Sequence, residues 1–493
     1  MMSITTIVAA LSSAAIILIT LTHNLKGRSS ETLPPNSPPT VPSFIPWAGS
    51  LLSFLWDAQT FLHGCRSTYG SVFRLKMVGR HYTVITDADG IMNVMRDPQK
   101  VLASPNVTLM EAGGDLELGS IGQAIHDKLA VSVMRIFSPR TIPIISPVLI
   151  EQFRTNFRNF ASLSDGHSRV MLTHFVGQTM YSSVCMALWG PRFPTETFSE
   201  FYLIDSNLLR LLSPMLLPPR KSVHARETIK TLLGEYMAGL GQDEEEYGGM
   251  EVPIAIHDLE IPAPVKEGLF LGLMFGLHSN TFRTTTWLMQ YLLCDKQLWA
   301  RLREEVDTAI NKHFGSLQKL ISAPPHLFGE TFFPLLDSAL KETMRLSIVA
   351  VILRRATVDC DILINEHKSV HIKEGEYVYT HRDRINMSDE YFENAKTFRA
   401  DRFMNYTEEQ PQPMSTFGGG AHICKGREFA IYEMKIFAIL CLRLLDFEAE
   451  RPDGSSAEGY IPEAVYAYPT PVYFPKDLYI YVRPRQDPDI ESI

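Results

Sequence analysis

Near the C-terminal end of the chain, three consecutive glycines lead to one cysteine and then to a long apolar segment. The stretch FGGGAHICKGREFA covers residues 417–430, and IYEMKIFAILCLRLLDF follows with the composition of a buried helix. Glycine allows positive φ and a close approach of the backbone to a flat partner. The chain must therefore build a backbone loop that presents Cys424 at the start of a core helix.

The position of Cys424 is compatible with two roles. A thiolate just before a helix N-terminus is stabilised by the helix dipole and by loop N–H groups. A soft thiolate of this kind is a suitable axial ligand for haem iron. The alternative is a buried structural cysteine, which is the usual fate of a lone cysteine. The loop alone leaves both interpretations open.

The composition limits the class of protein. The chain has 493 residues and a net charge of -9, with 45% hydrophobic and 20% charged residues, which is enough apolar material for a large core. No long Lys/Arg run occurs, so nucleic acid is a poor candidate partner. The six cysteines are scattered without a C-x-x-C spacing. This argues against a disulfide framework and a structural zinc site, and it fits a reducing compartment.

The N-terminal segment predicts a membrane anchor. The first 25 residues contain no Lys, Arg, Asp or Glu, and Ile4–Leu21 is mostly apolar. A helix of this length spans about 27 Å, close to the hydrocarbon thickness of a bilayer. Lys26 and Arg28 follow, so the positive-inside bias puts the body of the protein on the cytoplasmic side. A cleaved signal peptide is the alternative.

The rest of the chain predicts one large domain that is mainly α with a smaller β-rich part. Gly70–Asp89 alternates β-branched and polar residues around VGR, which indicates a hairpin. From about residue 91 to 320 the pattern is mainly helical, and short strands return from residue 351 onwards. We expect an anchor over residues 1–25, a proline-rich linker over 26–49 and a catalytic domain over 50–493.

The cysteine loop resembles the haem-binding signature of the cytochrome P450 family. Phe417, Gly420, Cys424 and Gly426 stand at the spacing F-x-x-G-x-x-x-C-x-G, and Lys425 replaces the common proline after the cysteine. The resemblance implies the cytochrome P450 fold, with haem b as cofactor and Cys424 as the iron ligand. The residues that it assigns to cofactor binding are Cys424, Phe417, Gly418, Gly420, His422, Gly426, Arg354 and His126.

Three further segments agree with the order found in the family. KETMRL carries Glu342 and Arg345 at i, i+3, which by helix geometry alone is a surface ion pair. In the family this pair is buried and joins a downstream arginine, here Arg402 of FRADRF. LRRATVD resembles the strand whose arginine, here Arg354, pairs with a haem propionate. IHDKLAVSVMRIFSP resembles the family's helix C, with His126 in place of a common tryptophan.

Leu271–Leu293 resembles the long helix over the haem but departs from the family pattern. Alignment on Trp287 puts Ser279 at the family's acid position and Asn280 at its threonine, with Thr281 next. These three are the candidate catalytic residues, and a packing role is the alternative for Asn280. No carboxylate occurs in this segment, and an Asn amide does not carry a proton as a carboxyl does. Acid-assisted proton delivery in its usual form is therefore not expected.

The NT and TW pairs in this helix resemble the branch that contains sterol 7α- and 12α-hydroxylases and prostacyclin synthase. The segment after the E-x-x-R helix is expected to line a hydrophobic substrate pocket through Val349, Ala350 and Val351. The resemblance implies a monooxygenase that hydroxylates a lipophilic substrate in specialised-metabolite biosynthesis. One alternative is an isomerase that works without a reductase, and another is a non-catalytic haem-binding ligand sensor.

The resemblance also implies partners and a location. Electrons would come from NADPH through NADPH–cytochrome P450 reductase. The chain would be a single-pass protein of the endoplasmic reticulum membrane, in contact with membrane lipid, with its catalytic domain in the cytoplasm.

Overall fold

The computed structural model describes most of the body of the chain. The described residues are 36–43, 45, 47–97, 101–103, 122–138, 140–164, 169–212, 218–240, 249–348, 352–381, 383–407, 416–420, 423–465 and 472–486. The expected anchor, residues 1–25, and the first part of the expected linker lie outside these ranges. Within them, no helix has both the length and the apolar character needed to cross a membrane.

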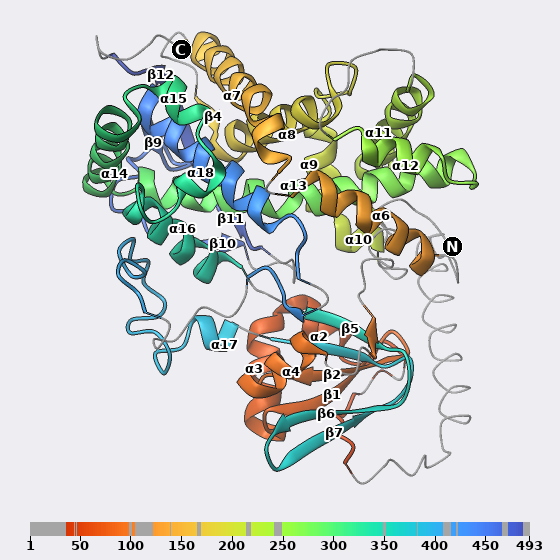
Figure 1. The fold of residues 1–493 in the computed structure, drawn as a ribbon. Coiled ribbons are helices and arrows are strands. Elements are labelled where there is room, and N and C mark those ends of the chain that lie inside the picture. Colours follow the sequence, from red (N-terminus) through yellow and green to blue (C-terminus); the bar gives the residue numbers. More distant parts are fainter. Residues whose placement is uncertain are drawn as a thin grey trace, which may run out of the picture.

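A five-stranded sheet with short helices beside it forms the lower part of the molecule in Figure 1. The strand order is β1-β2-β8-β5-β3, and β6 and β7 form a separate hairpin. The strands are β1 (Val72–Met77), β2 (Arg80–Ile85), β3 (Leu102–Ala103), β5 (Ile352–Ala356), β6 (Cys360–Asn365), β7 (Lys368–Ile372) and β8 (Tyr377–Thr380). The helices beside them are α2 (Leu51–Trp56), α3 (Ala58–Tyr69), α4 (Ala88–Arg96) and α17 (Asp383–Asn386).

The hairpin predicted over Gly70–Asp89 is confirmed. β1 and β2 pair antiparallel along their whole length. The two turn residues, Val78 and Gly79, have φ of 51° and 71°, the left-handed conformations that a two-residue hairpin turn requires. β2 then pairs in parallel with β8. Segments from both ends of the chain therefore share one sheet, as the sequence predicted.

Helices form the upper part of the molecule in Figure 1. In chain order they are α6 (Gly122–Ile136), α7 (Ile142–Ser164), α8 (Leu172–Trp189), α9 (Phe198–Ser206), α10 (Leu208–Leu212), α11 (Arg220–Ala238), α12 (Glu251–His257), α13 (Ala263–Leu293), α14 (Lys296–Thr308), the π-helix η2 (Ala309–Phe314), α15 (Leu317–Ile321), the 3-10 helix η3 (Pro325–Phe328), α16 (Pro334–Ser347) and α18 (Arg427–Leu444). Two small sheets complete this part, β4 (Val170–Met171) with β12 (Tyr479–Pro484) and β9 (Leu445–Glu450), and β10 (Ala464–Val465) with β11 (Phe474–Pro475).

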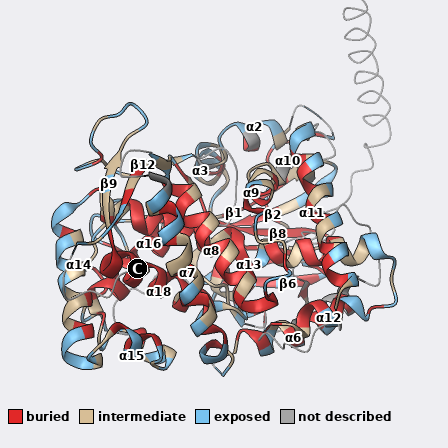
Figure 2. Ribbon diagram, turned by 90° about the horizontal axis from the view of Figure 1, so that it is seen from above, coloured by how far each residue is buried: buried red, intermediate tan, exposed pale blue. Residues whose placement is uncertain are grey.

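Helices α13 and α18 lie in the core of the helical part, where Figure 2 shows mostly buried residues. Between Leu277 and Gln290 every residue of α13 is buried except the half-buried Asn280. All residues from Tyr432 to Leu444 of α18 are buried. The prediction of a core helix after the cysteine loop is therefore confirmed.

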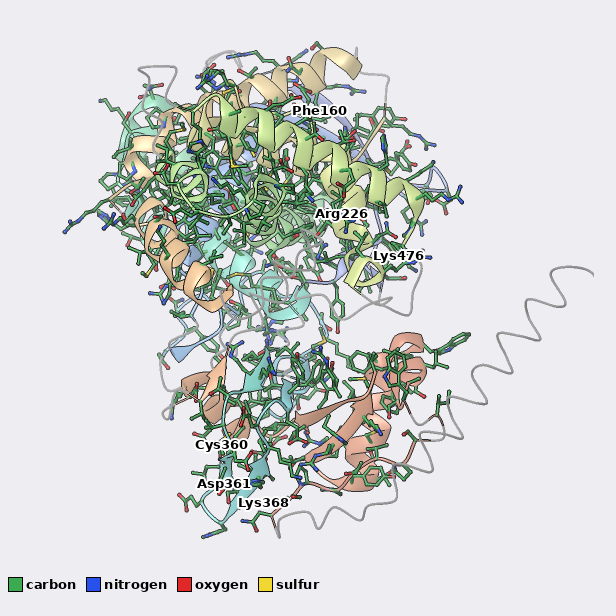
Figure 3. All side chains as sticks on the ribbon, turned by 90° about the vertical axis from the view of Figure 1, so that its right-hand side faces the viewer. Phe160, Arg226, Cys360, Asp361, Lys368 and Lys476 are labelled. Atoms are coloured by element: carbon green, nitrogen blue, oxygen red, sulfur yellow. The ribbon has the colours of Figure 1, made fainter. Side chains whose placement is uncertain are left out.

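The labelled side chains in Figure 3 mark the two parts of the molecule. Figure 3 shows Cys360, Asp361 and Lys368 together on the β6–β7 hairpin, at the far end of the sheet part, whereas Phe160 and Arg226 lie in the helical part. The cysteine loop and α13 belong to the helical part, and the β6–β7 hairpin contributes no candidate site residue.

Candidate functional site

The loop before α18 holds Cys424 in a defined backbone conformation. The Cys424 N–H donates to the carbonyl oxygen of Phe417 at 2.8 Å. Gly418 and Gly420 reach φ of 75° and 58°, which an L side chain adopts only with strain. Cys424 is exposed, whereas the other five cysteines are buried, and all six are free. This exposure argues against a buried structural cysteine.

The same loop packs closely against the end of α4. A Cβ added at Gly420 would lie 2.5 Å from the carbonyl oxygen of Met95 and 2.8 Å from that of Arg96. One added at Gly419 would lie 2.7 Å from the Met95 side chain. Because the atoms that face Gly420 are backbone atoms, they cannot rotate away. Position 420 therefore requires glycine both for its φ and for the space.

The surroundings of Cys424 disfavour its thiolate on balance. The residue exposes part of its surface, yet desolvation by the crowded loop raises the pKa of the Cys424 thiol. A hydrogen bond from the Gly426 N–H and the positive charges of Arg427 and Lys425 only partly offset this rise. The stabilisation expected from the helix N-terminus is therefore outweighed. A coordinated metal ion would supply the missing positive charge, because it deprotonates a thiol outright.

A buried ion cluster joins α16 to the segment that precedes the cysteine loop. Arg345 donates from Nε and Nη2 to the two carboxylate oxygens of Glu342, each at 2.8 Å. Arg402 donates from Nε to Glu342 at 2.9 Å, and the Arg399 N–H does so at 3.1 Å. The side chains of Glu342 and Arg345 are fully buried. The pair is therefore not the surface ion pair that helical spacing alone suggests.

Arg354 on β5 is a buried cation with donors to spare. Its Nη1 donates to the carbonyl oxygen of Leu353 at 2.9 Å, and its Nε has no hydrogen-bond partner among the described residues. Desolvation lowers the pKa of Arg354 to about 10, with Asp97 acting in the opposite direction. The guanidinium thus stays charged at neutral pH and is suited to receive a further anion.

The three candidate residues of α13 contact different neighbours. Ser279 donates from Oγ to Asp205 of α9. Thr281 lies within 3.2 Å of the carbonyl oxygens of two residues one turn earlier in α13, and it also hydrogen-bonds Glu433 of α18. The Oδ1 atom of Asn280 is buried and has no hydrogen-bond partner in the described part of the chain. Buried carboxyl groups from two other helices therefore flank this segment.

Glu433 and Asp205 are residues that the sequence interpretation missed. Burial raises the pKa of Glu433 to about 8, although the hydrogen bond with Thr281 lowers it. This carboxyl is therefore protonated up to about neutral pH. The available signal was a single acid in each of two apolar stretches, FYLIDSN and AIYEMKIF, because a lone acid among apolar residues needs a buried partner.

Several predicted site residues lie outside the described residues. These are His422 of the cysteine loop, the pocket residues Val349, Ala350 and Val351, and the side chain of His126 on α6. The described candidates fall into three groups: the cysteine loop, the Glu342 cluster that joins the segment preceding it, and the α13 segment between α9 and α18. α18 connects the first and third groups, because it begins at the loop and carries Glu433.

Comparison with known proteins places this architecture in a class. A model of the family described as "Cytochrome P450" matches residues 267–460, the range that includes α13, the Glu342 cluster and the cysteine loop. Among solved structures, retinoic acid bound cyanobacterial CYP120A1 superposes with a TM-score of 0.67 at 21% identity, covering 91% of this chain and 99% of that chain. The fold is thus that of a cytochrome P450, mainly helical with a smaller sheet part.

Sequence similarity to proteins of known name agrees with this fold. Cytochrome P450 7B1 of Mus musculus is 24% identical over 452 residues, covering 85% of this chain and 86% of its own. The 7-alpha-hydroxycholest-4-en-3-one 12-alpha-hydroxylase of Oryctolagus cuniculus is 24% identical over 452 residues, covering 85% and 88%. Prostacyclin synthase of Rattus norvegicus is 22% identical over 456 residues, covering 85% and 89%. The resemblance of this chain to the cytochrome P450 family, and to this branch of it, is confirmed.

The family uses haem with a thiolate ligand and takes electrons from NAD(P)H through a reductase. The described residues fit such a group. Cys424 offers an exposed sulfur beside a glycine loop, and Arg354 offers a buried guanidinium with an unpartnered Nε that suits a propionate. When bound, the haem supplies the redox chemistry that activates dioxygen.

Proposed function

We propose that this protein is a monooxygenase that hydroxylates a lipophilic, sterol-sized substrate, with Cys424 as the haem ligand. The observation that carries the proposal is the single exposed cysteine in a glycine loop that leads directly into a buried helix. The substrate class is drawn from relatives whose names describe sterol hydroxylases. The proposed biological role is a step in specialised-metabolite biosynthesis.

The proposed roles of the chain's residues follow from their contacts. The Glu342 cluster braces the segment that leads into the cysteine loop, since Arg402 also donates to the carbonyl oxygens of Glu393, at 2.7 Å, and Thr397, at 3.1 Å. Arg354 holds a haem propionate. Glu433 keeps a proton at neutral pH next to Thr281. His422 and His126 as propionate partners, and Val349, Ala350 and Val351 as pocket lining, remain predictions.

The proposal includes a membrane location and a redox partner. Residues 1–25 would anchor the chain once in the endoplasmic reticulum membrane, and residues 50–493 would form the cytoplasmic catalytic domain. The uncharged apolar N-terminal segment, with Lys26 and Arg28 after it, supports this orientation. NADPH–cytochrome P450 reductase would supply the electrons.

The identity of the iron ligand is tested by Cys424→Ser. The purified wild-type protein, reduced and exposed to carbon monoxide, should give the red-shifted band of thiolate-bound ferrous haem, and Cys424→Ser should not. Cys360→Ser is the matched control, because Cys360 is a buried cysteine on β6 in the sheet part. A red-shifted band that persists in Cys424→Ser would contradict the assignment.

The reaction class is tested by leaving out the reductase. We expect consumption of a lipophilic substrate, identified by a ligand-induced spin-state shift, to require both reductase and NADPH. The absence of a carboxylate between Leu271 and Leu293 of α13 is the feature that favours the isomerase alternative. Product formed from a peroxide or epoxide with reductase and NADPH withheld would support that alternative and contradict the monooxygenase.

A further inference from the structure

The segment Leu271–Leu293 of α13 contains no acid, but an acid from another helix lies beside it. Ser279 donates its hydroxyl hydrogen bond to Oδ1 of Asp205, and Arg283, one turn further along α13, donates from Nη2 to Oδ2 of the same carboxylate. Asp205 lies in α9, in the sequence FYLIDSN. A carboxylate from another helix thus lies within one hydrogen bond of Ser279.

The ion pair between Arg283 and Asp205 is buried. The side chains of Arg283 and Asp205 are 2% and 1% exposed. The Arg283 guanidinium lies 3.8 Å from the ring centre of Phe474 on β11. Burial raises the pKa of Asp205, while Arg283 and the Ser279 hydrogen bond lower it. The ion pair therefore links α9 to α13, and the contact of Arg283 with the Phe474 ring links α13 to β11.

The hydrogen-bond directions have a consequence for the α13 segment. A serine hydroxyl has one proton and two lone pairs, and the proton of Ser279 is committed to Asp205. Ser279 can therefore only accept a further hydrogen bond. The neighbouring Asn280 has a buried Oδ1 with no partner among the described residues. The segment thus offers two acceptors, which point in directions about 100° apart because adjacent residues of an α-helix do not face each other.

We propose that Asp205 is a positioning residue that fixes the Ser279 hydroxyl as an acceptor for a hydrogen-bond donor, either an ordered water or a hydroxyl group of the substrate. Arg283 keeps the carboxylate in place. The inference rests on the proposed function, because the donor is useful to oxygen chemistry only if α13 crosses the haem. It also means that α9, and not α13, supplies the negative charge at this position.

The first test removes the hydroxyl and leaves the ion pair intact. The measured quantity is the fraction of NADPH electrons that reduce dioxygen to hydrogen peroxide instead of forming product, in the haem-loaded protein with reductase. Ser279→Ala should raise this fraction about tenfold, the size expected for the loss of a hydrogen bond to a charged group. Ser279→Thr should restore the wild-type fraction. Ser222→Ala is the matched control, since Ser222 is a buried serine that donates to a backbone carbonyl of α9.

The second test asks whether Asp205 and Ser279 act as a unit. Asp205→Asn should give the same rise in peroxide release, and the double variant no more than either single variant. A merely structural role predicts lowered melting temperatures with an unchanged fraction of NADPH electrons going to hydrogen peroxide. The melting temperatures of the wild type, the two single variants and the double variant form a double-mutant cycle. This cycle measures the Asp205–Ser279 interaction without an activity assay.

The outcomes separate this inference from the proposed function. If Ser279→Ala forms hydrogen peroxide at the wild-type fraction, in a preparation whose wild type is reductase-dependent, the inference is overturned and the proposed function stands. A wild type that consumes no NADPH overturns the proposed function. The double-mutant cycle of melting temperatures then tests the Asp205–Ser279 contact without a measurement of activity. If the effects of the two substitutions on the melting temperature are additive in that cycle, the positioning role of Asp205 is overturned.

Discussion

Glu433 should make the stability of this protein fall as the pH rises. Its side chain is buried in α18, Oε1 has no hydrogen-bond partner in the described part of the chain, and Thr281 hydrogen-bonds the carboxyl group. Burial raises the pKa of Glu433 from 4.5 to about 8, so the folded state holds a proton that the unfolded chain has already lost. This contribution to stability is fully present below about pH 4.5 and is lost as the pH rises through 8.

The size of the effect follows from the two pKa values. One unit of pKa corresponds to about 1.36 kcal/mol, so between about pH 5.5 and about pH 8.5 the contribution of Glu433 falls by roughly 3 kcal/mol. Glu433→Gln keeps the shape of the side chain and cannot ionise. The variant should therefore lose roughly 3 kcal/mol less than the wild type over this range.

The assay is urea unfolding followed by circular dichroism at both pH values, with the m-values compared to exclude a change in the surface exposed. Glu428→Gln is the control variant, because Glu428 is an exposed acid in the first turn of the same helix. If Glu433→Gln and Glu428→Gln lost the same free energy of unfolding between the two pH values, the reasoning about the buried carboxyl would be wrong.

Three further outcomes follow from the site. Glu342→Gln should cost about 3–5 kcal/mol in urea unfolding, because it leaves two buried guanidinium groups without their anion; an exposed-pair value below about 1 kcal/mol would contradict the burial. Gly420→Ala should abolish haem retention, whereas Gly454→Ala, with φ of 83° and no atom within 4 Å of its added Cβ, should retain it. Arg354→Gln should speed haem loss to a scavenger about tenfold or more, the loss expected for a charge-assisted hydrogen bond, and an unchanged rate would rule out the propionate contact.

Local patterns in the sequence were sufficient for the elements. The alternation around VGR predicted the β1–β2 hairpin, and its turn has the conformation that the pattern requires. The apolar run after Cys424 predicted a core helix, and α18 is buried from Tyr432 to Leu444. The spacing around Cys424 was enough to detect the resemblance to the cytochrome P450 family. These features depend on residues close together in the chain, so periodicity and motif spacing can report them.

The tertiary structure alone decided the electrostatics of the site. Helical spacing suggested a weak surface pair for Glu342 and Arg345, yet the packing of α16 buries both and adds Arg402. Ser279 of α13 hydrogen-bonds Asp205 of α9, an acid that lies 74 residues earlier in the chain. Such contacts join segments far apart in the chain, and burial, which sets both the cost of a charge and its pKa, exists only after those segments have packed.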